Sequence, residues 1–529
     1  MEDMNAGYRA GRVMLPLCDR TVTTDISGDF SLPDYQPEIK RLLRIRASVL
    51  PAGKYCGINE IDVNGGINYF VLYTGNDDKL YCAPLSTEYS FSVPLDGGDF
   101  SSEDMLCLCN TEVDSATGRV TAPRRLNIKS RLKSNVKAYA DTTPGGAYDS
   151  DSLTPGSIER LIGSLDSCRI LSAIGEPLQL ADDIIPDIRN GNMRVVCAEG
   201  EVFVSGTGAV QGGVTCRGEL NLKLMLSPVY DEQEEQEQAV VSADTLPTVI
   251  TRKIPFSQTI EIDGADVGYD SYAYGSCSEL SVEIDEGHIH VEAGVILEVT
   301  AQKNETVSYV KDMYSTRHSC DCKYKDISTE SAVRCINGNF TQSDSLPLSE
   351  SGIDPAARII DVSGDAVIEG ATVDEERCVI TGKSRYHLIL CRDGEYSFAE
   401  IELPFRYETE GAPSGSVCHG TVTVMTCRAR MDGERVGIDA ELAPALRIFK
   451  KQNITMLTDA EFKDGGADEA LTRRRGEYVV CFPSDEDTLW SIAKKYHSPM
   501  ATLSVANSLS GTASPDSRES IEGIRYLIV

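Results

Sequence analysis

Three sequence elements recur three times, in the same order, along this chain of 529 residues. The first is a short apolar and acidic segment that ends at a proline, namely Pro37, Pro186 and Pro355. Next come a strand pair and a strand led by a second proline, namely Pro84, Pro255 and Pro404. The third is a hairpin that turns at a glycine, namely Gly118, Gly287 and Gly433. Because a pattern that repeats along a sequence is typical of repeated structural units, we expect three homologous β domains.

The spacing within the repeats supports this interpretation. The first proline precedes the second by 47, 69 and 49 residues, and the second precedes the glycine by 34, 32 and 29. The one long interval contains the acidic segment 230–247, which we expect to be a loop inserted between strands. The expected organisation is a leader at 1–20, repeats at 21–141, 150–325 and 326–462, a linker at 463–476 and a final domain at 477–529.

Alternation of apolar and polar residues predicts a mainly antiparallel β fold. In HIHVEAGVILEVT one face carries Ile289, Val291, Ala293, Val295, Leu297 and Val299, and the other carries His288, His290 and Glu292. The proline of each proline-led strand fits an edge or first position, because its missing N–H costs little there. Helix is sparse, and we expect it after Pro155, where four apolar residues have helical spacing, namely Ile158, Leu161, Ile162 and Leu165.

The net charge of −32 excludes two classes of partner. Binding to nucleic acids or to anionic membranes needs clusters of Lys and Arg, and an acidic chain is not expected to provide them. We find no apolar run long enough for a signal peptide in residues 1–20, and none elsewhere long enough for a membrane span. We therefore expect a cytosolic protein. Its 17 cysteines should be mostly buried thiols, and a minority can cross-link if the surroundings become oxidising.

Two groups of residues have side chains of the kind that bind zinc. They are the strand face with His288, His290 and Glu292, and the segment RHSCDC with His318, Cys320 and Cys322. Alternation along a solvated strand produces the first group without any function, and Cys-x-Cys is not the usual zinc spacing. We therefore predict no metal, no cofactor and no catalytic residue, so the protein is not expected to be an enzyme. A metal-dependent enzyme on the second repeat stays open as a rival.

The C-terminal segment has a different pattern, which predicts strand, helix, helix and strand. The first strand is Tyr478–Phe482, and the second is IRYLIV at the end of the chain. Asp487 or Thr488 can cap the first helix, and Ser498 the second, with Pro499 in its first position and Asn507 at its end. The first helix has an apolar stripe of Leu489, Ile492, Ala493 and Tyr496. Trp490, the only tryptophan, lies off this stripe or at its margin, either as a partly exposed interface anchor or as core filler.

This segment resembles the LysM domain, whose hallmark is a strand followed by residues such as GDTLWSIAKRY, here EDTLWSIAKKY. The resemblance implies a βααβ fold that binds its ligand, usually an N-acetylglucosamine polymer, between the loop before the first helix and the loop after the second. The corresponding candidate binding residues are Ser484, Asp485, Glu486, Asp487, Thr488, Leu489, Trp490, Asn507, Ser508 and Leu509. Glu486 replaces the usual glycine, which removes a permissive backbone position and adds a charge. The structural alternative is a small cap on the third repeat.

The repeats in turn resemble the SPOCS domain. DISGDFSLPDYQPEIKRLL is similar to the opening DVSGEFTLPDYKPDI of that domain, and KIPFSQTIEIDGA to its PFSQFIEVPGA strand. SPOCS domains followed by a LysM domain are the layout of a family of spore-envelope morphogenesis proteins. This resemblance implies a non-enzymatic scaffold that works in the mother-cell cytoplasm and is recruited to the forespore surface and spore coat.

The same resemblance implies the partners. The LysM domain is expected to bind stage IV sporulation protein A, the ATPase that forms the basement layer of the coat, and other coat proteins are further expected partners. The alternative is a protein of the cortex or cell wall that binds peptidoglycan through N-acetylglucosamine.

Overall fold

The structure is a computed structural model that describes residues 12–95, 100–143, 158–186, 193–229, 246–285, 287–374, 376–463, 479–509 and 514–529. Most of the described residues lie in antiparallel strands, as the sequence predicts. Most of the expected insert at 230–247 and of the expected linker at 463–476 lies outside the described residues.

The strands form three successive units. The first unit contains β1 (Val13–Ser31), β2 (Ile39–Val49), β3 (Gly53–Cys56), β4 (Glu60–Gly75), β5 (Leu80–Pro94), β6 (Met105–Ala122) and β7 (Arg125–Thr142). The second unit contains β8 (Ile158–Ile174), β9 (Leu178–Ile184), β10 (Met193–Val210), β11 (Gly213–Pro228), β12 (Thr248–Glu261), β13 (Asp270–Asp285) and β14 (His288–Ser315). The third unit contains β15 (Ser319–Asn337), β16 (Phe340–Pro347), α2 (Leu348–Ser351), β17 (Arg358–Asp374), β18 (Arg377–Arg392), β19 (Glu395–Glu410), β20 (Ser416–Asp432) and β21 (Arg435–Lys463).

The C-terminal domain follows the third unit. It contains β22 (Val480–Cys481), α3 (Leu489–Lys495), α4 (Met500–Ala506), the 3₁₀ turn η4 (Arg518–Ile521) and β23 (Leu527–Ile528), in the expected βααβ order. Another 3₁₀ turn, η1 (Ser102–Asp104), precedes β6 in the first unit.

Each unit is built from two sheets in the same strand order. One sheet has a central last strand: β7 lies between β1 and β6, β14 between β8 and β13, and β21 between β15 and β20. The other sheet is centred on β4, β11 or β18. In the second and third units the first strand is interrupted, so that β9 and β16 continue the pairing of β8 and β15. The common topology is direct structural support for a repeated architecture.

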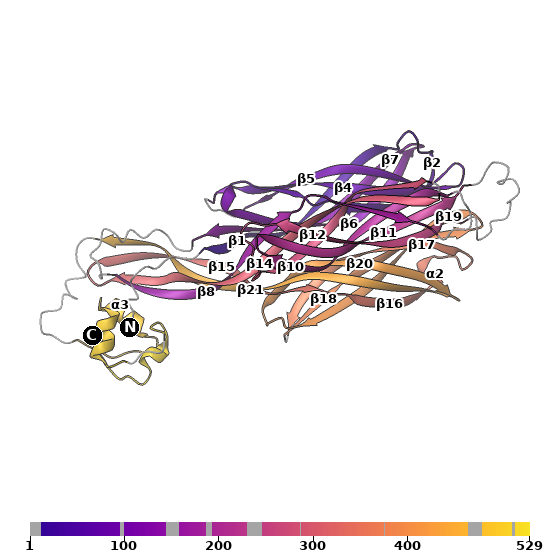
Figure 1. Ribbon diagram of the computed structural model, residues 1–529. Helices are drawn as coiled ribbons and strands as arrows, with labels where there is room; N and C mark the ends of the chain where they lie inside the picture. Colours follow the sequence, from indigo (N-terminus) through magenta and orange to yellow (C-terminus); the bar gives the residue numbers. More distant parts are fainter. Residues whose placement is uncertain are drawn as a thin grey trace.

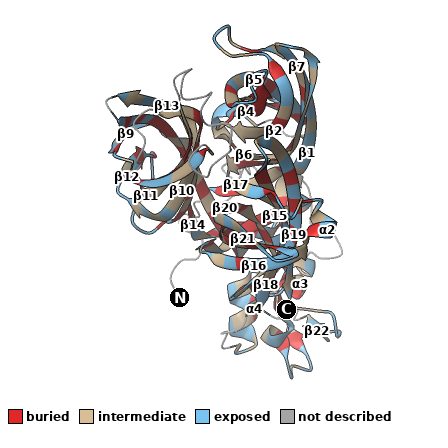
Figure 2. Ribbon diagram, turned by 90° about the vertical axis from the view of Figure 1, so that its right-hand side faces the viewer, coloured by how far each residue is buried: buried red, intermediate tan, exposed pale blue. Residues whose placement is uncertain are grey.

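Figure 1 shows these strands running roughly along an elongated body, with the small helical domain beside one end, near β8 and β15. Figure 2 shows the three units as three lobes around a shared centre. Each unit keeps its own core between its two sheets. In the second unit the core includes the whole predicted apolar face of β14, from Ile289 to Val299, while His288, His290 and Glu292 are exposed. We name the three units together the β body.

The three proline-led strands are edge strands of their sheets. Pro84 lies in β5, Pro255 in β12 and Pro404 in β19, each of which pairs with one neighbouring strand of its sheet. A proline costs no ladder hydrogen bond on the open side of such a strand, so the edge position is confirmed. The prolines lie inside these strands, however, and do not begin them.

The glycine prediction is right at two positions and wrong at one. Gly287 and Gly433 lie in the β13–β14 and β20–β21 turns with φ of 83° and 60°, where glycine is favoured. Gly118 instead lies within β6, opposite Ile128 of β7. A Cβ at Gly118 would lie 2.1 Å from Cδ1 of Ile45 in β2. This glycine therefore permits the two sheets of the first unit to pack closely and does not make a turn.

The expected helix at 158–165 is also wrong, because these residues begin β8. Ile158 pairs with Ser315 and Leu165 with Val307 of β14. The four apolar residues fit a helical spacing, but the buried ones, Leu161 and Leu165, lie four residues apart and also share one face of a strand. The long partner strand β14 decides between the two conformations.

Two expected boundaries differ from the strand boundaries. β1 begins at Val13, within the expected leader 1–20. Its pairing with β7 has a bulge between Pro16 and Cys18, which accommodates the proline that made a strand hard to predict here. β15 begins at Ser319, within the range expected for the second repeat, but it pairs with β21 of the third unit. Pairing over long sequence distances sets both boundaries.

Candidate functional site

The candidate site predicted from the sequence is the C-terminal domain, and its first loop is organised by short-range hydrogen bonds. The backbone N–H and hydroxyl of Ser484 donate to Oδ2 of Asp487 at 2.7 and 2.8 Å, which lowers the pKa of that carboxyl. Thr488 is the N-cap of α3, and it exchanges hydrogen bonds with Ser491 in a capping box. Asp487 therefore holds the loop, and Thr488 is the cap.

The second loop is fixed by Asn507. Its side-chain amide donates to the carbonyl oxygens of Leu503 and Ile528, both at 2.8 Å, and accepts the backbone N–H of Ile528 at 2.7 Å. Asn507 is the C-cap of α4, as predicted, and it also extends the pairing of β23. The residue before α4 is Pro499, so the N-cap expected at Ser498 lies one residue further along the chain.

A third segment, which the sequence prediction did not include, covers the start of α3. The backbone N–H of Trp490 donates to the carbonyl oxygen of Pro515 at 2.9 Å, and that of Leu489 to Oγ of Ser520 at 3.3 Å. Arg518 pairs with Asp485 at 2.7 Å across the two loops. These contacts use backbone donors that a helix start otherwise offers to a ligand.

The ten predicted site residues therefore separate by exposure. Ser484, Asp485, Glu486 and Ser508 are exposed, and Asp487, Thr488, Asn507 and Leu509 are half-buried. Leu489 and Trp490 are buried in the core of the domain. The exposed residues are the ones of this set that are open to a ligand.

Trp490 is not the partly exposed residue that one sequence interpretation requires. It is 5% exposed, and its ring meets Tyr314 of β14 edge-on with centroids 5.0 Å apart. Its indole N–H donates to Oδ2 of Asp312, also in β14, at 2.7 Å. Trp490 thus fills the core and anchors an interface within the same chain, since β14 belongs to the second unit.

Asp312 is the centre of this interface. Besides the indole it accepts hydrogen bonds from Nζ of Lys494 at 2.6 Å and from the Tyr324 hydroxyl at 2.5 Å. Burial by itself raises the pKa of Asp312, but the hydrogen bonds from Lys494, Trp490 and Tyr324 outweigh it, so that the pKa is lowered. The carboxylate is therefore ionised at neutral pH and links α3 to β14 and β15.

Further contacts join the C-terminal domain to the end of β14. The Tyr314 hydroxyl donates to the carbonyl oxygen of Ser498 at 2.7 Å, and Nδ1 of His497 lies 2.7 Å from the carbonyl oxygen of Ser315. Leu161 of β8 and Tyr314 belong to the same apolar cluster as Trp490. The hydrophobic core of the domain is therefore continuous with the second unit.

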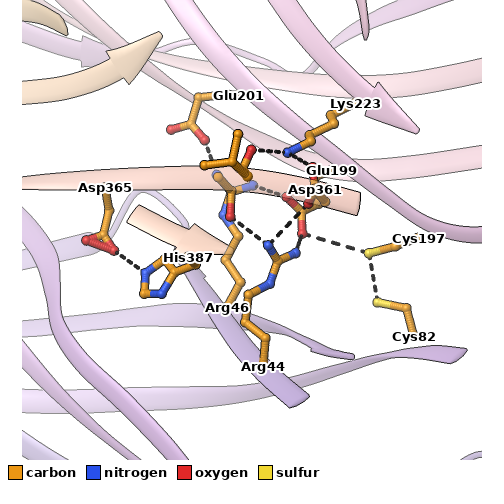
Figure 3. A network of polar contacts seen from close by, with 12 residues as sticks. Arg44, Arg46, Cys82, Cys197, Glu199, Glu201, Lys223, Asp361, Asp365 and His387 are labelled. Atoms are coloured by element: carbon orange, nitrogen blue, oxygen red, sulfur yellow. Dashed lines mark hydrogen bonds and ion pairs between the residues drawn. The ribbon is translucent and has the colours of Figure 1, made fainter. Parts of the chain in front are cut away.

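A second group of side chains, most of them charged, lies where the three units meet (Figure 3). Arg44 of β2 contacts Glu199 of β10 and lies 3.6 Å from Asp361 of β17. The side chains of these residues are at most 4% exposed. Burial by itself raises the pKa of Glu199, but Arg44, Arg46 and Lys223 lower it to about 2. We name the set Arg44, Arg46, Glu199, Glu201, Lys223 and Asp361 the central network.

Most of the central network comes from equivalent strands of the three units, namely β2, β10 and β17, while Lys223 comes from β11. Each unit has a bulge in the strand concerned, and the residue after it is Arg44, Cys197 or Asp361. The bulged residues themselves, Leu43, Val196 and Ile360, meet in one apolar cluster. Equivalent strands of the three units therefore converge on a common axis, but the residue at the equivalent position differs from unit to unit. Sequence spacing carries no signal for this convergence.

Beside the central network the three units line a partly open pocket of about 420 Å³. Its lining includes Arg46, Glu112, Glu201, Asp365 and His387, so both acidic and basic groups face it. Burial raises the pKa of Glu112 to about 7. The charged groups of the central network are paired with one another, an arrangement that joins the units.

The two groups of residues considered as zinc ligands in the sequence contact protein side chains. Nδ1 of His290 lies 2.5 Å from Oδ1 of Asp183, and the rings of His288 and His290 stack on the exposed face of β14. Cys320 and Cys322 have their sulfurs 3.4 Å apart. In the described part of the chain, no group of three or more His, Cys, Asp or Glu side chains is placed to hold a metal ion.

These features define an antiparallel β protein of three repeated units with a small βααβ domain packed on the second unit. The family model of the LysM domain matches residues 485–516, so the chain contains a LysM domain. No curated protein and no solved structure matches the chain. Within the described ranges, the helices are too short or too polar to cross a membrane.

Proposed function

We propose that this protein is a non-enzymatic scaffold in the assembly of a bacterial spore envelope. In this proposal its LysM domain is an adaptor that binds the coat-basement ATPase, stage IV sporulation protein A, at the forespore surface. The β body gives the adaptor a rigid support and offers surfaces to other coat proteins. The protein acts in the mother-cell cytoplasm and is recruited from there to the forespore surface.

The observation that carries this proposal is how the LysM domain is held. α3 is bonded to β14 through Trp490 and Lys494, and the turn after α3 through His497. The loop residues Ser484, Asp485 and Glu486 are exposed. A binding module that is held in a fixed orientation by its own chain is suited to an adaptor, because little freedom is lost when the partner binds.

The LysM domain also has an apolar face that fits a protein partner. Cys481 and Leu527 point into the core from β22 and β23, so their neighbours point outward. These neighbours are Phe482, which is 75% exposed, Tyr526, which is 57% exposed, and Val480. Exposed aromatic residues beside one another are typical anchors of protein interfaces. We name Val480, Phe482 and Tyr526 the outer sheet face.

The second candidate is a protein that binds peptidoglycan through N-acetylglucosamine. The match to the LysM family favours it, because glycan polymers are the usual ligands of that family. Glu486 and the segment that covers the start of α3 favour the protein partner.

The experiment compares both ligands on the full chain. The wild-type protein is expected to capture purified stage IV sporulation protein A and to stay in the supernatant with sedimented peptidoglycan. Phe482→Ser with Tyr526→Ser should weaken capture at least about tenfold, because a tenfold loss needs only about 1.4 kcal/mol and interface anchors contribute about 2 kcal/mol each. Val505→Ser is the matched control, since Val505 is 77% exposed on α4. Sedimentation that N-acetylglucosamine oligomers compete away would support the glycan candidate instead.

A further inference from the structure

Two thiols from different units lie side by side next to the central network (Figure 3). Sγ of Cys197 in β10 is 2.9 Å from Sγ of Cys82 in β5. Cys197 is buried and Cys82 is half-buried. Their positions are 115 residues apart in the sequence, and their strands belong to the second and first units. The contact therefore bridges two units that are built from separate sheets.

Strand pairing and packing fix both backbones at this contact. Cys82 is opposite Leu72 of β4, and Cys197 follows the bulge of β10 and is opposite Met225 of β11. Leu72, Met225 and Cys197 belong to one apolar cluster, and Cys82 packs against it. The two sulfurs need to approach by only roughly 1 Å to reach a disulfide bond length of about 2.0 Å.

Three other cysteine pairs of the described chain lie within single units. Cys320 and Cys322 are two residues apart on β15, so a disulfide between them would link residues that the strand already holds together. The thiols of Cys56 and Cys107 interact within the first unit, and those of Cys378 and Cys418 within the third. The pair Cys82 and Cys197 differs because it links two units.

We propose that Cys82 and Cys197 are a cross-linking site, at which a hydroperoxide oxidises the two thiols to a disulfide between the first and second units. The Cys82 sulfur attacks the O–O bond of hydrogen peroxide, which gives a sulfenic acid and releases water. The Cys197 sulfur then attacks the Cys82 sulfur and displaces the hydroxyl as a second water. Two thiols and one peroxide thus yield one disulfide and two waters, and the peroxide accepts both electrons.

The surroundings determine which thiol reacts first. The Cys197 thiol is held by its contact with Cys82 and by burial, which together raise its pKa well above the ordinary value. Cys82 is the more accessible of the two, so a small peroxide meets it first. Cys197 then acts as the resolving thiol, which is already in contact with the sulfur it attacks.

The test is peroxide treatment of the full-length, pre-reduced protein at neutral pH, followed by denaturation, alkylation and peptide mass spectrometry. A linked pair of peptides that contain Cys82 and Cys197 is expected, and dithiothreitol should remove it. The link closes a long loop, so the melting temperature should rise by about 3 °C or more and return to its initial value on reduction. Cys320→Ala, in which both partners remain, should behave like the wild type.

Cys82→Ala and Cys197→Ala should each lose the linked peptides and the rise in melting temperature. Separate alkylation of Cys82 and Cys197 in peroxide-treated wild type would overturn the proposal, as would links that pair either residue with another cysteine. This measurement on the wild type decides the question even if a variant fails to fold.

Discussion

The indole of Trp490 and the carboxylate of Asp312 are hydrogen-bonded at 2.7 Å although 178 residues separate them in the sequence. The bond connects the LysM domain to the second β unit, and Lys494 binds the same carboxylate. Because Trp490 is the only tryptophan of the chain, its fluorescence reports on this one interface.

Asp312→Ala should loosen the LysM domain from the β body. The substitution removes the acceptor of the indole N–H and the carboxylate partner of Lys494, at a cost of about 1–3 kcal/mol. The expected result is a red shift of tryptophan emission with an unchanged far-ultraviolet circular dichroism spectrum. Asp263→Ala, at an exposed aspartate of the same unit, is the matched control. An unshifted emission maximum in Asp312→Ala would contradict the assignment of this contact.

The same contact should weaken in acid. The folded pKa of Asp312 is lowered from the ordinary 3.8, so its contribution is complete above pH 3.8 and is lost as the pH falls through the lowered value. Tryptophan emission measured during acid titration should therefore shift below about pH 3.8. In Asp312→Asn, which has no titrating group at this position, that part of the shift should be missing. Identical titration curves for the two proteins would show that other carboxylates control the release.

Glu199→Gln should destabilise the junction of the three units. The change leaves the buried Arg44 and the half-buried Arg46 with less opposite charge, and removing one partner of a buried pair such as Arg44 and Glu199 costs about 3–5 kcal/mol. Thermal unfolding followed by circular dichroism should show a lower midpoint. Glu261→Gln, at an exposed position of β12, should leave it unchanged. Equal midpoints for both variants would mean that the central network contributes little.

Gly118→Ala should destabilise the first unit by about 1–3 kcal/mol, because the added methyl group overlaps the end of the Ile45 side chain. Gly206→Ala is the matched control, since nothing lies within 4 Å of a Cβ placed there in β10. Chemical denaturation of both variants measures the difference. The double variant Gly118→Ala with Ile45→Ala should remove the clash, so Gly118→Ala should cost less in the Ile45→Ala background than in the wild type.

Features that depend on local chemistry were predictable from the sequence. The alternation in β14 requires only that one strand face is buried, and the edge positions of Pro84, Pro255 and Pro404 follow from a missing N–H. The capping role of Thr488 is likewise set by its immediate neighbours.

Features that depend on a distant partner were not predictable. The segment at Ile158 has helical spacing, but pairing with β14 makes it a strand. Trp490 is buried because residues of another unit cover it, which the pattern of its own helix does not contain. Contacts such as that of Arg44 with Glu199 depend on how the units are arranged around the axis. The residue pattern within one unit carries no information about that arrangement.

The position of Asp361 has a consequence for biosynthesis. Arg44 and Glu199 leave the ribosome before Asp361, and the LysM helix that covers Tyr314 is translated later still. During synthesis the early units therefore carry an incomplete set of counter-charges and an uncovered aromatic end. A chain that ends before Asp361 therefore exposes charged and aromatic groups that the full-length chain pairs and covers.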